Sequence, residues 1–367
     1  MGPMKANDSR ITLPQFTGLR GLAALLVLFF HVRSLQGTEL HFGLADAFSK
    51  FGVLGVDMFF VLSGFILSHV YGKMFADGYD GKALRAYGVA RFSRIYPLHF
   101  VTLFMMLGAY AVALRVGVDP TVTSGYSLRN LVLSLFLVNE WFGVVAPNPG
   151  SWSISVEFAS YLIFPILTFR LLRLPSYMPT LVLVVGVIII ESFSGRVLRG
   201  FTEFAMGCAA YVAARHYDAR PLSIFAGITF AIPFVAAAIA GHELASLSAV
   251  SFAATVFLLS GSPSPDPFRY LCSTRVLVFL GEISYSVYLL QWFIWIGWKH
   301  VIANTPFFSV HPHVMVLGAA GSIIFCATAS FYFFEKPMRV WLRRLNCVQL
   351  PREATVTVGQ NRITERN

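Results

Sequence analysis

The chain has 367 residues, of which 56% are hydrophobic and only 13% are charged, and it carries a net charge of +10. About a quarter of the residues of a soluble globular domain are charged, so this composition excludes an ordinary soluble protein and predicts an integral membrane protein. The Lys and Arg residues lie in short segments between apolar runs. That arrangement is typical of the cytoplasmic face of a membrane protein, not of a nucleic-acid-binding surface.

The chain divides into apolar segments separated by short polar stretches. A helix needs roughly 20 apolar residues to cross the hydrocarbon of a bilayer. The candidate segments, in chain order, are 15–34, 51–71, 96–115, 128–146, 152–169, 179–194, 198–214, 222–240, 245–261, 277–298 and 314–334. We therefore predict an all-α integral membrane protein in which residues 15–344 form one membrane domain.

The two ends of the chain are polar. Residues 1–14 form a leader with Lys5 and Arg10. No small-residue cleavage site follows the first apolar segment, so we expect a retained helix, not a cleaved signal peptide. Residues 345–367 are polar and of mixed charge, which predicts a flexible cytoplasmic tail. The four cysteines show neither disulfide nor metal-ligand spacing, and we predict no metal site.

Segment 128–146 is the one least suited to crossing the membrane. Asn139 and Glu140 interrupt it, which favours a re-entrant segment or a half-helix. If it does not cross and the N-terminus is cytoplasmic, 21 of the 28 Lys and Arg residues lie inside, whereas only 11 do if it crosses. Because Lys and Arg accumulate on the cytoplasmic side, we predict ten spanning helices, one half-helix and both termini in the cytoplasm.

The first apolar segment carries two ionisable residues on one helical face. Arg20 and His31 are eleven residues apart, which is three turns plus about 20° and roughly 16 Å along the axis. In the predicted topology Arg20 lies at the cytoplasmic surface, where it suits an anionic ligand, and His31 lies toward the outside as a titratable base. The alternative is a boundary arginine and a structural histidine bonded inside the bundle.

The next polar segments supply candidate partners for these two residues. Asp57 lies in the outer part of the second predicted helix, where its carboxylate can orient and charge-stabilise His31. Arg85, Arg91 and Arg94 lie in a basic cytoplasmic stretch, and arginine forks suit phosphate groups. The alternative for these arginines is an ordinary positive-inside loop.

Two later segments also carry polar groups into the membrane. Glu157 follows Trp152 in the outer part of predicted helix 152–169, and an ionisable residue inside a membrane helix is by default a functional candidate. Residues 281–292 bring Tyr285 and Gln291 into predicted helix 277–298.

Together these segments resemble the acyltransferase-3 family of membrane acyltransferases, from Leu19 to Glu335. The matching motifs are Arg20-(ten residues)-His31, Asp57-x-Phe-Phe with Ser63-Gly-Phe, Arg91-x-x-Arg94-Ile-x-Pro, Trp152-Ser-x-x-x-Glu157, Ile-Ser-Tyr285-x-x-Tyr-Leu and Glu335-Lys336-Pro337. One position departs from the pattern. Members often carry a histidine where this chain has Gln291, which can form hydrogen bonds but cannot titrate.

The resemblance implies an O-acyltransferase in a bacterial inner membrane that moves an acyl group from a cytoplasmic acyl-CoA. It implies acetyl-CoA as the donor and a hydroxyl of an extracytoplasmic or lipid-linked glycan as the acceptor. Such a reaction needs a base for the alcohol and a positioned donor. We expect Arg20, Arg85, Arg91 and Arg94 to bind the CoA nucleotide and His31 to act as the base, oriented by Asp57.

We expect Glu157 to shape the acceptor site, and Trp152, Tyr285 and Gln291 to bind substrate. A covalent acyl-histidine relay and direct transfer are both open. The alternative function is a proton-coupled transporter or exporter of a sugar- or lipid-linked molecule, which would use the same buried residues as a proton relay.

Overall fold

The computed structural model describes residues 13–33, 50–75, 78, 80–115, 123–171, 175–193, 195–261, 266–305, 307 and 311–345. Within these residues all regular structure is helical, so the predicted all-α class is confirmed. The predicted leader, apart from residues 13 and 14, and the predicted tail, apart from residue 345, lie outside the described part of the chain.

Seven stretches of the described chain are long and apolar enough to cross a membrane. They are formed by α1 (Pro14–Arg33), α3 (Leu54–Phe75), α4 (Gly81–Arg115), α6 (Ser151–Leu171), η3 (Arg220–Phe225) with α9 (Ala226–Ala240), α12 (Arg275–Asn304), and α14 (Pro312–Ser330) with the segment after it. The chain is therefore a multi-pass membrane protein.

Three further helices complete the predicted set of ten. Two are apolar but short, α7 (Met178–Ser192) and α10 (Ala245–Gly261). The third, α8 (Arg196–His216), is 21 residues long and includes Arg199 and Glu203. It packs against α3, α6, α7 and α10, and Glu203 lies buried inside the bundle. The count of ten crossings and the orientation remain predictions.

Segment 128–146 folds into two short pieces. These are α5 (Leu128–Leu135) and the 3-10 turn η2 (Glu140–Phe142). The Ser127 hydroxyl caps α5 by accepting from the backbone N–H of Asn130 at 3.2 Å. Eight residues of helix extend about 12 Å, well short of the roughly 30 Å of a hydrocarbon core. This is the geometry expected of a half-helix.

Helices α1 and α12 run parallel, since Arg20 bonds to Ser284 and His31, farther along α1, packs on Trp292. Their backbones are in close contact near the start of α12. A Cβ atom added to Gly281 would lie 1.8 Å from the carbonyl oxygen of Thr17, and one added to Gly21 would lie 2.1 Å from that of Leu277. Glycine is needed at both positions because no side chain fits between the two backbones. This glycine seam fixes α12 alongside the helix that carries Arg20 and His31.

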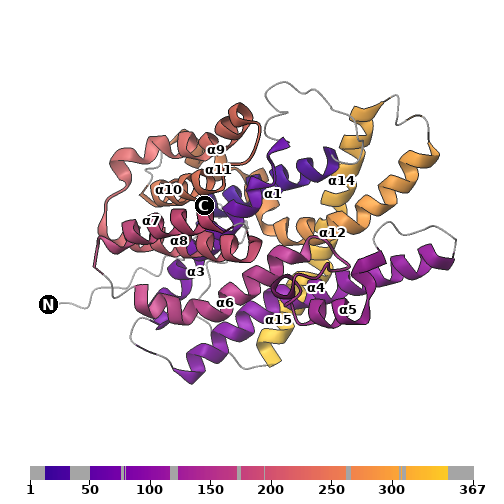
Figure 1. Cartoon of the computed structure of the whole chain (residues 1–367), viewed down its shortest axis with the longest axis horizontal. Coiled ribbons are helices and arrows are strands. Elements are labelled where there is room, and N and C mark those ends of the chain that lie inside the picture. Colours follow the sequence, from indigo (N-terminus) through magenta and orange to yellow (C-terminus); the bar gives the residue numbers. More distant parts are fainter. Residues whose placement is uncertain are drawn as a thin grey trace, which may run out of the picture.

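The helices fall into two groups around α1 and α3 (Figure 1). On one side α7, α8, α9 and α10 pack against one another, and on the other side α12 contacts α4 and α14. Helix α3 joins the groups, because it packs against α1 and also meets α8 through Gly64 and Gly207.

Three features of the described chain differ from the predicted segments. Helix α4 begins at Gly81, fifteen residues before predicted segment 96–115. A short helix, α11 (Pro267–Cys272), precedes α12. After α14 the chain passes through the π-helical turn η4 (Phe331–Glu335) into the basic helix α15 (Lys336–Leu345).

Candidate functional site

A cavity of about 390 Å³ opens among α1, α3, α4, α12 and α15, and its walls combine apolar side chains with a group of cations. Its basic residues are Arg20, Arg91, Arg94, Lys336, Arg339 and Arg343. Glu282 and Glu335 are its acidic residues. We call it the basic cavity. Since cations outnumber carboxylates on its walls, it favours an anionic ligand.

Two of the arginines are held in fixed positions. Arg20 donates a hydrogen bond from Nη2 to Ser284 Oγ at 3.1 Å. Arg91 donates from Nη2 to the Tyr71 hydroxyl at 2.7 Å, and its guanidinium lies over the rings of Tyr71 and Tyr161 at 4.9 and 5.6 Å from the centroids. Arginines that are already ordered lose less entropy when they bind a phosphate.

The structure brings together three of the four arginines that the sequence assigned to the donor. Arg20, Arg91 and Arg94 line the basic cavity, whereas Arg85 is exposed on the first turns of α4 and lies outside its lining. Arg85 is six residues before Arg91. Six residues are 600° of helix, which puts Arg85 on a different face from Arg91.

The cations of α15 were not predicted as site residues. Glu335 fixes the start of this helix, because it accepts from Ser286 Oγ at 2.7 Å and pairs with Arg339. Lys336, Arg339 and Arg343 then line the basic cavity along α15. The motif Glu335-Lys336-Pro337 was the available signal, since it joins an acidic anchor to a basic helix.

His31 lies farther along α1 and packs against an aromatic side chain of α12. The ring centroids of His31 and Trp292 are 4.7 Å apart and nearly perpendicular. His31 Nδ1 is 2.8 Å from the carbonyl oxygen of Val27. The Nδ1–H tautomer donates to that carbonyl, which leaves Nε2 as the nitrogen that can accept a proton.

Glu157 lies inside the bundle, where its carboxylate accepts two hydrogen bonds. Ser63 Oγ donates to Glu157 Oε1 at 2.9 Å, and the Tyr161 hydroxyl donates to the same oxygen at 2.5 Å. Arg20 is close enough for its charge to interact with those of Glu157 and Arg94. Glu157 therefore lies within electrostatic reach of Arg20, a residue of the basic cavity.

The three predicted substrate-binding residues lie in different places. Tyr285 lines the basic cavity and donates to the carbonyl of Ile95 at 2.5 Å. Gln291 is buried one residue before Trp292 and donates from Nε2 to the carbonyl of Tyr288 at 3.1 Å. Trp152 packs under the guanidinium of Arg196, 5.1 Å from the ring centroid.

Asp57 is held by α8 and not by His31. It forms an ion pair with Arg199, which also pairs with Glu203 at 3.1 Å and with Glu243 at 3.5 Å. We call these four residues the Arg199 cluster. It joins α3, α8 and the connection after α9.

The packing of α1 on α3 gives the distance between Asp57 and His31. Gly55 meets Ala23 and Gly52 meets Leu26, so the two helices are antiparallel and Asp57 lies level with Ala23. His31 is eight residues beyond Ala23, about 12 Å along the axis. That is beyond hydrogen-bond reach, so the structure does not bring Asp57 to His31.

Among the residues that the structure describes, no three His, Cys, Asp or Glu side chains are arranged to hold a metal ion.

The chain was compared with known proteins. A family model described as an acyltransferase domain, acyltransferase 3, matches residues 13–331. The acyltransferase MdmB of Streptomyces mycarofaciens is 36% identical over 175 residues, which are 44% of this chain and 41% of that relative. No solved structure matches the chain.

Two further relatives are named for peptidoglycan. The peptidoglycan O-acetyltransferase OatA of Listeria monocytogenes is 28% identical over 173 residues, covering 43% of this chain and 24% of the relative. The putative peptidoglycan O-acetyltransferase YrhL of Bacillus subtilis is 23% identical over 391 residues, covering 89% and 55%. The matches thus span between about a quarter and just over half of the length of these three relatives.

The family model covers most of the chain, and the matched region holds the Arg20–His31 pair, most of the basic cavity and Glu157. The chain belongs to the acyltransferase-3 family of membrane acyltransferases.

Proposed function

We propose that the protein is a membrane O-acyltransferase that moves an acyl group, acetyl in the simplest case, from cytoplasmic acyl-CoA to a hydroxyl of an extracytoplasmic or lipid-linked glycan. One observation carries this proposal. The basic cavity lies at one end of α1, and His31 lies on the same helical face as Arg20, roughly 16 Å farther along the axis. The names of the relatives agree with acyl transfer, and two of them agree with a cell-wall glycan as acceptor.

In this proposal the basic cavity holds the phosphates of the CoA nucleotide. Arg20, Arg91 and Arg94 supply charge-assisted hydrogen bonds, and Arg339 and Arg343 add to the positive field. The pantetheine arm is proposed to extend from the basic cavity along the helical face of α1 that carries Arg20 and His31, so the thioester is positioned before it reacts.

The proposed chemical step begins with the base. His31 Nε2 takes the proton of the acceptor hydroxyl as its oxygen attacks the thioester carbonyl carbon. The new C–O bond forms, the C–S bond breaks, and the proton leaves on the CoA thiolate, so atoms and charge balance. A relay through acyl-histidine would use the same nitrogen as the nucleophile.

The remaining candidates take supporting parts. Glu157 is proposed to fix the positions of Ser63 and Tyr161, between the basic cavity and His31, and to balance the charge of Arg20. Gln291 and Trp152 are proposed to contact the acceptor. Asp57 stays a proposed part of the site, as a carboxylate that fixes α3 to α8 and not as a partner of the His31 ring.

The test is turnover of radiolabelled acetyl-CoA by the purified protein in liposomes that contain surface glycans. We expect His31→Ala to lower transfer by roughly 10²- to 10⁴-fold, the usual contribution of a general base. The matched control is His69→Gln on α3, since His69 is half-buried against Tyr211 at 5.9 Å and should leave transfer unchanged. Full activity of His31→Ala would show that His31 is not the general base. A wild-type protein that neither binds nor consumes acyl-CoA would favour the transporter function.

A further inference from the structure

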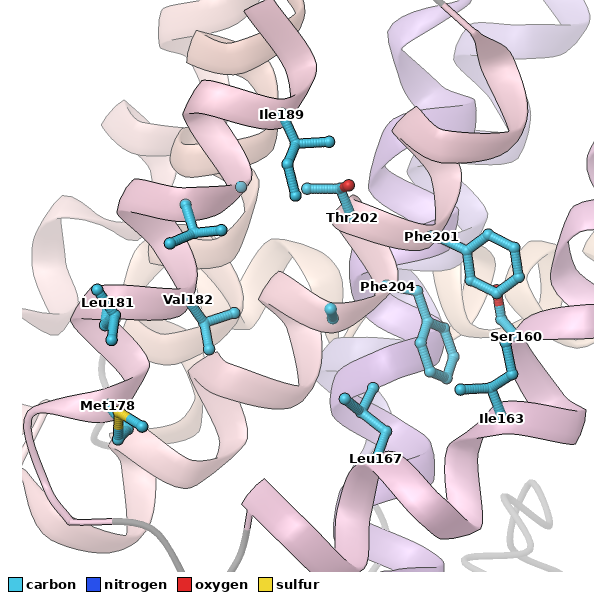
Figure 2. A pocket seen from close by; sticks show the side chains of 13 residues that line it. Ser160, Ile163, Leu167, Met178, Leu181, Val182, Ile189, Phe201, Thr202 and Phe204 are labelled. Carbon is cyan, nitrogen blue, oxygen red and sulfur yellow. The ribbon is translucent and has the colours of Figure 1, made fainter. Parts of the chain in front are cut away.

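A second cavity, of about 440 Å³, lies between α6, α7 and α8, and its lining shares no residue with the basic cavity. Figure 2 shows the side chains that line it. Helix α8 packs against both α6 and α7 and forms the floor. The walls are apolar side chains, among them Ile163 and Leu167 of α6, Leu181 and Val185 of α7, and Phe201 and Ala205 of α8. We call it the apolar groove.

The apolar groove is built for hydrocarbon. Its two hydroxyl side chains bond to their own helices, Ser160 to the carbonyl of Val156 at 2.9 Å and Thr202 to that of Leu198 at 2.8 Å. Both hydroxyl protons are therefore already donated, and only their oxygen lone pairs could accept from a sugar. Ile163, Leu181 and Val185 are 44%, 47% and 44% exposed, so the groove opens sideways to the lipid. An acyl chain can enter from the bilayer without unfolding any element.

The two ends of the apolar groove differ in charge. At the end formed by the starts of α6 and α8, Arg196 pairs with Glu140 at 3.0 Å and Arg199 belongs to the Arg199 cluster. Carboxylates there match or outnumber cations. That end does not suit a lipid phosphate.

The opposite end presents exposed cations. Ile163, Leu167 and Arg170 are spaced four and three residues apart, so Arg170 continues the wall of α6 beyond the groove. Arg215 is eleven residues after Phe204, which puts the two on one face of α8.

Contacts between the helices put these two cations at the same end. Helices α6 and α8 run parallel, since the Phe164 and Phe204 rings are 6.2 Å apart and Gly200 meets Val156. The Tyr217 hydroxyl bonds to the carbonyl of Ser176 at 3.2 Å, which ties the end of α8 to the start of α7. The described residues include no ion pair of Arg170 or Arg215 with a carboxylate.

We propose that the apolar groove binds an anionic glycerophospholipid, with one acyl chain between α6 and α7 and the phosphate on Arg170 and Arg215. The charge count of the sequence predicts that this end faces the cytoplasm, where anionic lipids meet basic residues. The carboxylate-rich opposite end excludes the reverse orientation. It also disfavours a polyprenyl phosphate held with its phosphate at that end. The bound glycerophospholipid would fill the gap between α6 and α7 and hold both helices against α8.

The test uses the full-length protein in nanodiscs, with retained lipid counted by native mass spectrometry. The probes are dioleoyl phosphatidylglycerol and dioleoyl phosphatidylcholine, which share acyl chains and differ in net charge. We expect the wild type to retain phosphatidylglycerol with a preference of roughly tenfold or more, as two cations near a lipid phosphate provide. Equal retention would overturn the proposal without any variant.

Variants then locate the site. The double variant Arg170→Gln/Arg215→Gln should lose the preference. The matched control Arg220→Gln should keep it, because Arg220 is paired with Asp218 at 3.0 Å and its hydrogen bond lowers the pKa of that carboxyl. Ala205→Phe, which narrows the groove, should reduce retention of both lipids. A double variant that keeps the full preference, or displacement of phosphatidylglycerol by a polyprenyl phosphate, would contradict the assignment.

Discussion

Arg199 illustrates how one buried cation can hold several carboxylates inside a membrane. Its side chain is 26% exposed, whereas those of Asp57 and Glu203 are 8% and 0% exposed. A buried carboxylate without its counter-ion is strongly destabilising. We expect Arg199→Gln to reduce the free energy of unfolding by about 3–5 kcal/mol, measured by denaturant unfolding in detergent micelles.

The control for Arg199 is Arg196 on the same helix. Its side chain is 61% exposed and its pair with Glu140 is close to the surface, so Arg196→Gln should cost no more than about 1 kcal/mol. Adding Glu203→Gln to Arg199→Gln should recover part of the loss. Equal losses for the two single arginine variants would show that the Arg199 cluster is not a buried charge network.

The donor arginines give a second comparison between single residues. Arg94→Gln removes a charged donor from the basic cavity, and such hydrogen bonds contribute about 1.5–3 kcal/mol. We expect a rise of roughly tenfold to a hundredfold in the KM for acetyl-CoA with a small change in kcat. Arg85→Gln, on the exposed face of the same helix, should leave both constants unchanged. A raised acceptor KM with an unchanged donor KM would move the nucleotide elsewhere.

Among single residues, the sequence predicted the group of donor arginines and missed the Arg199 cluster. Arg20, Arg91 and Arg94 were predicted to bind the donor together, and all three line the basic cavity. The pair of Asp57 with Arg199 joins residues 142 positions apart. No local motif links them, because the contact depends on how α3 packs against α8.

Among the helices, the close contact of α1 with α12 restricts the sequence most strongly, because it requires glycine where the two backbones meet. We expect Gly281→Ala to prevent this contact and to abolish the folded protein, because a Cβ would lie 1.8 Å from the Thr17 oxygen. Gly297→Ala on the same helix meets no atom within 4 Å and should instead stabilise by up to about 1 kcal/mol through helix propensity. Thermal unfolding after detergent extraction measures both. A stable Gly281→Ala variant would contradict the close backbone contact between α1 and α12.

Most elements were predictable from apolar runs alone. The predicted segments 15–34, 152–169 and 245–261 coincide with α1, α6 and α10 to within two residues or so. Helix α15 was not predicted, because it is ten residues long and four of them are basic, with its apolar residues on one face. Hydropathy cannot find such a helix, since what stabilises it is packing beside α4 and the anchor at Glu335.

For the molecule as a whole, the number of crossings decides which face meets acyl-CoA. Ten crossings put Lys82 and Arg220 inside, and Phe142 and His242 outside. We expect single cysteines at Phe142 and His242 to react with a membrane-impermeant maleimide in intact cells. Cysteines at Lys82 and Arg220 should react only after permeabilisation. Protection of Phe142→Cys together with labelling of Arg220→Cys would mean that segment 128–146 crosses.

The glycine seam joins two helices that are made far apart in time. Gly281 is synthesised 260 residues after Gly21, and at about 5–20 residues per second that interval is roughly 13 to 50 s. Throughout it, α1 is in the bilayer with its glycine face and Arg20 uncovered. Lipid or the insertion machinery must shield that face until α12 arrives. A ribosome that stalls within those seconds leaves a chain whose first helix has no permanent neighbour on that side, which is a ready signal for membrane quality control.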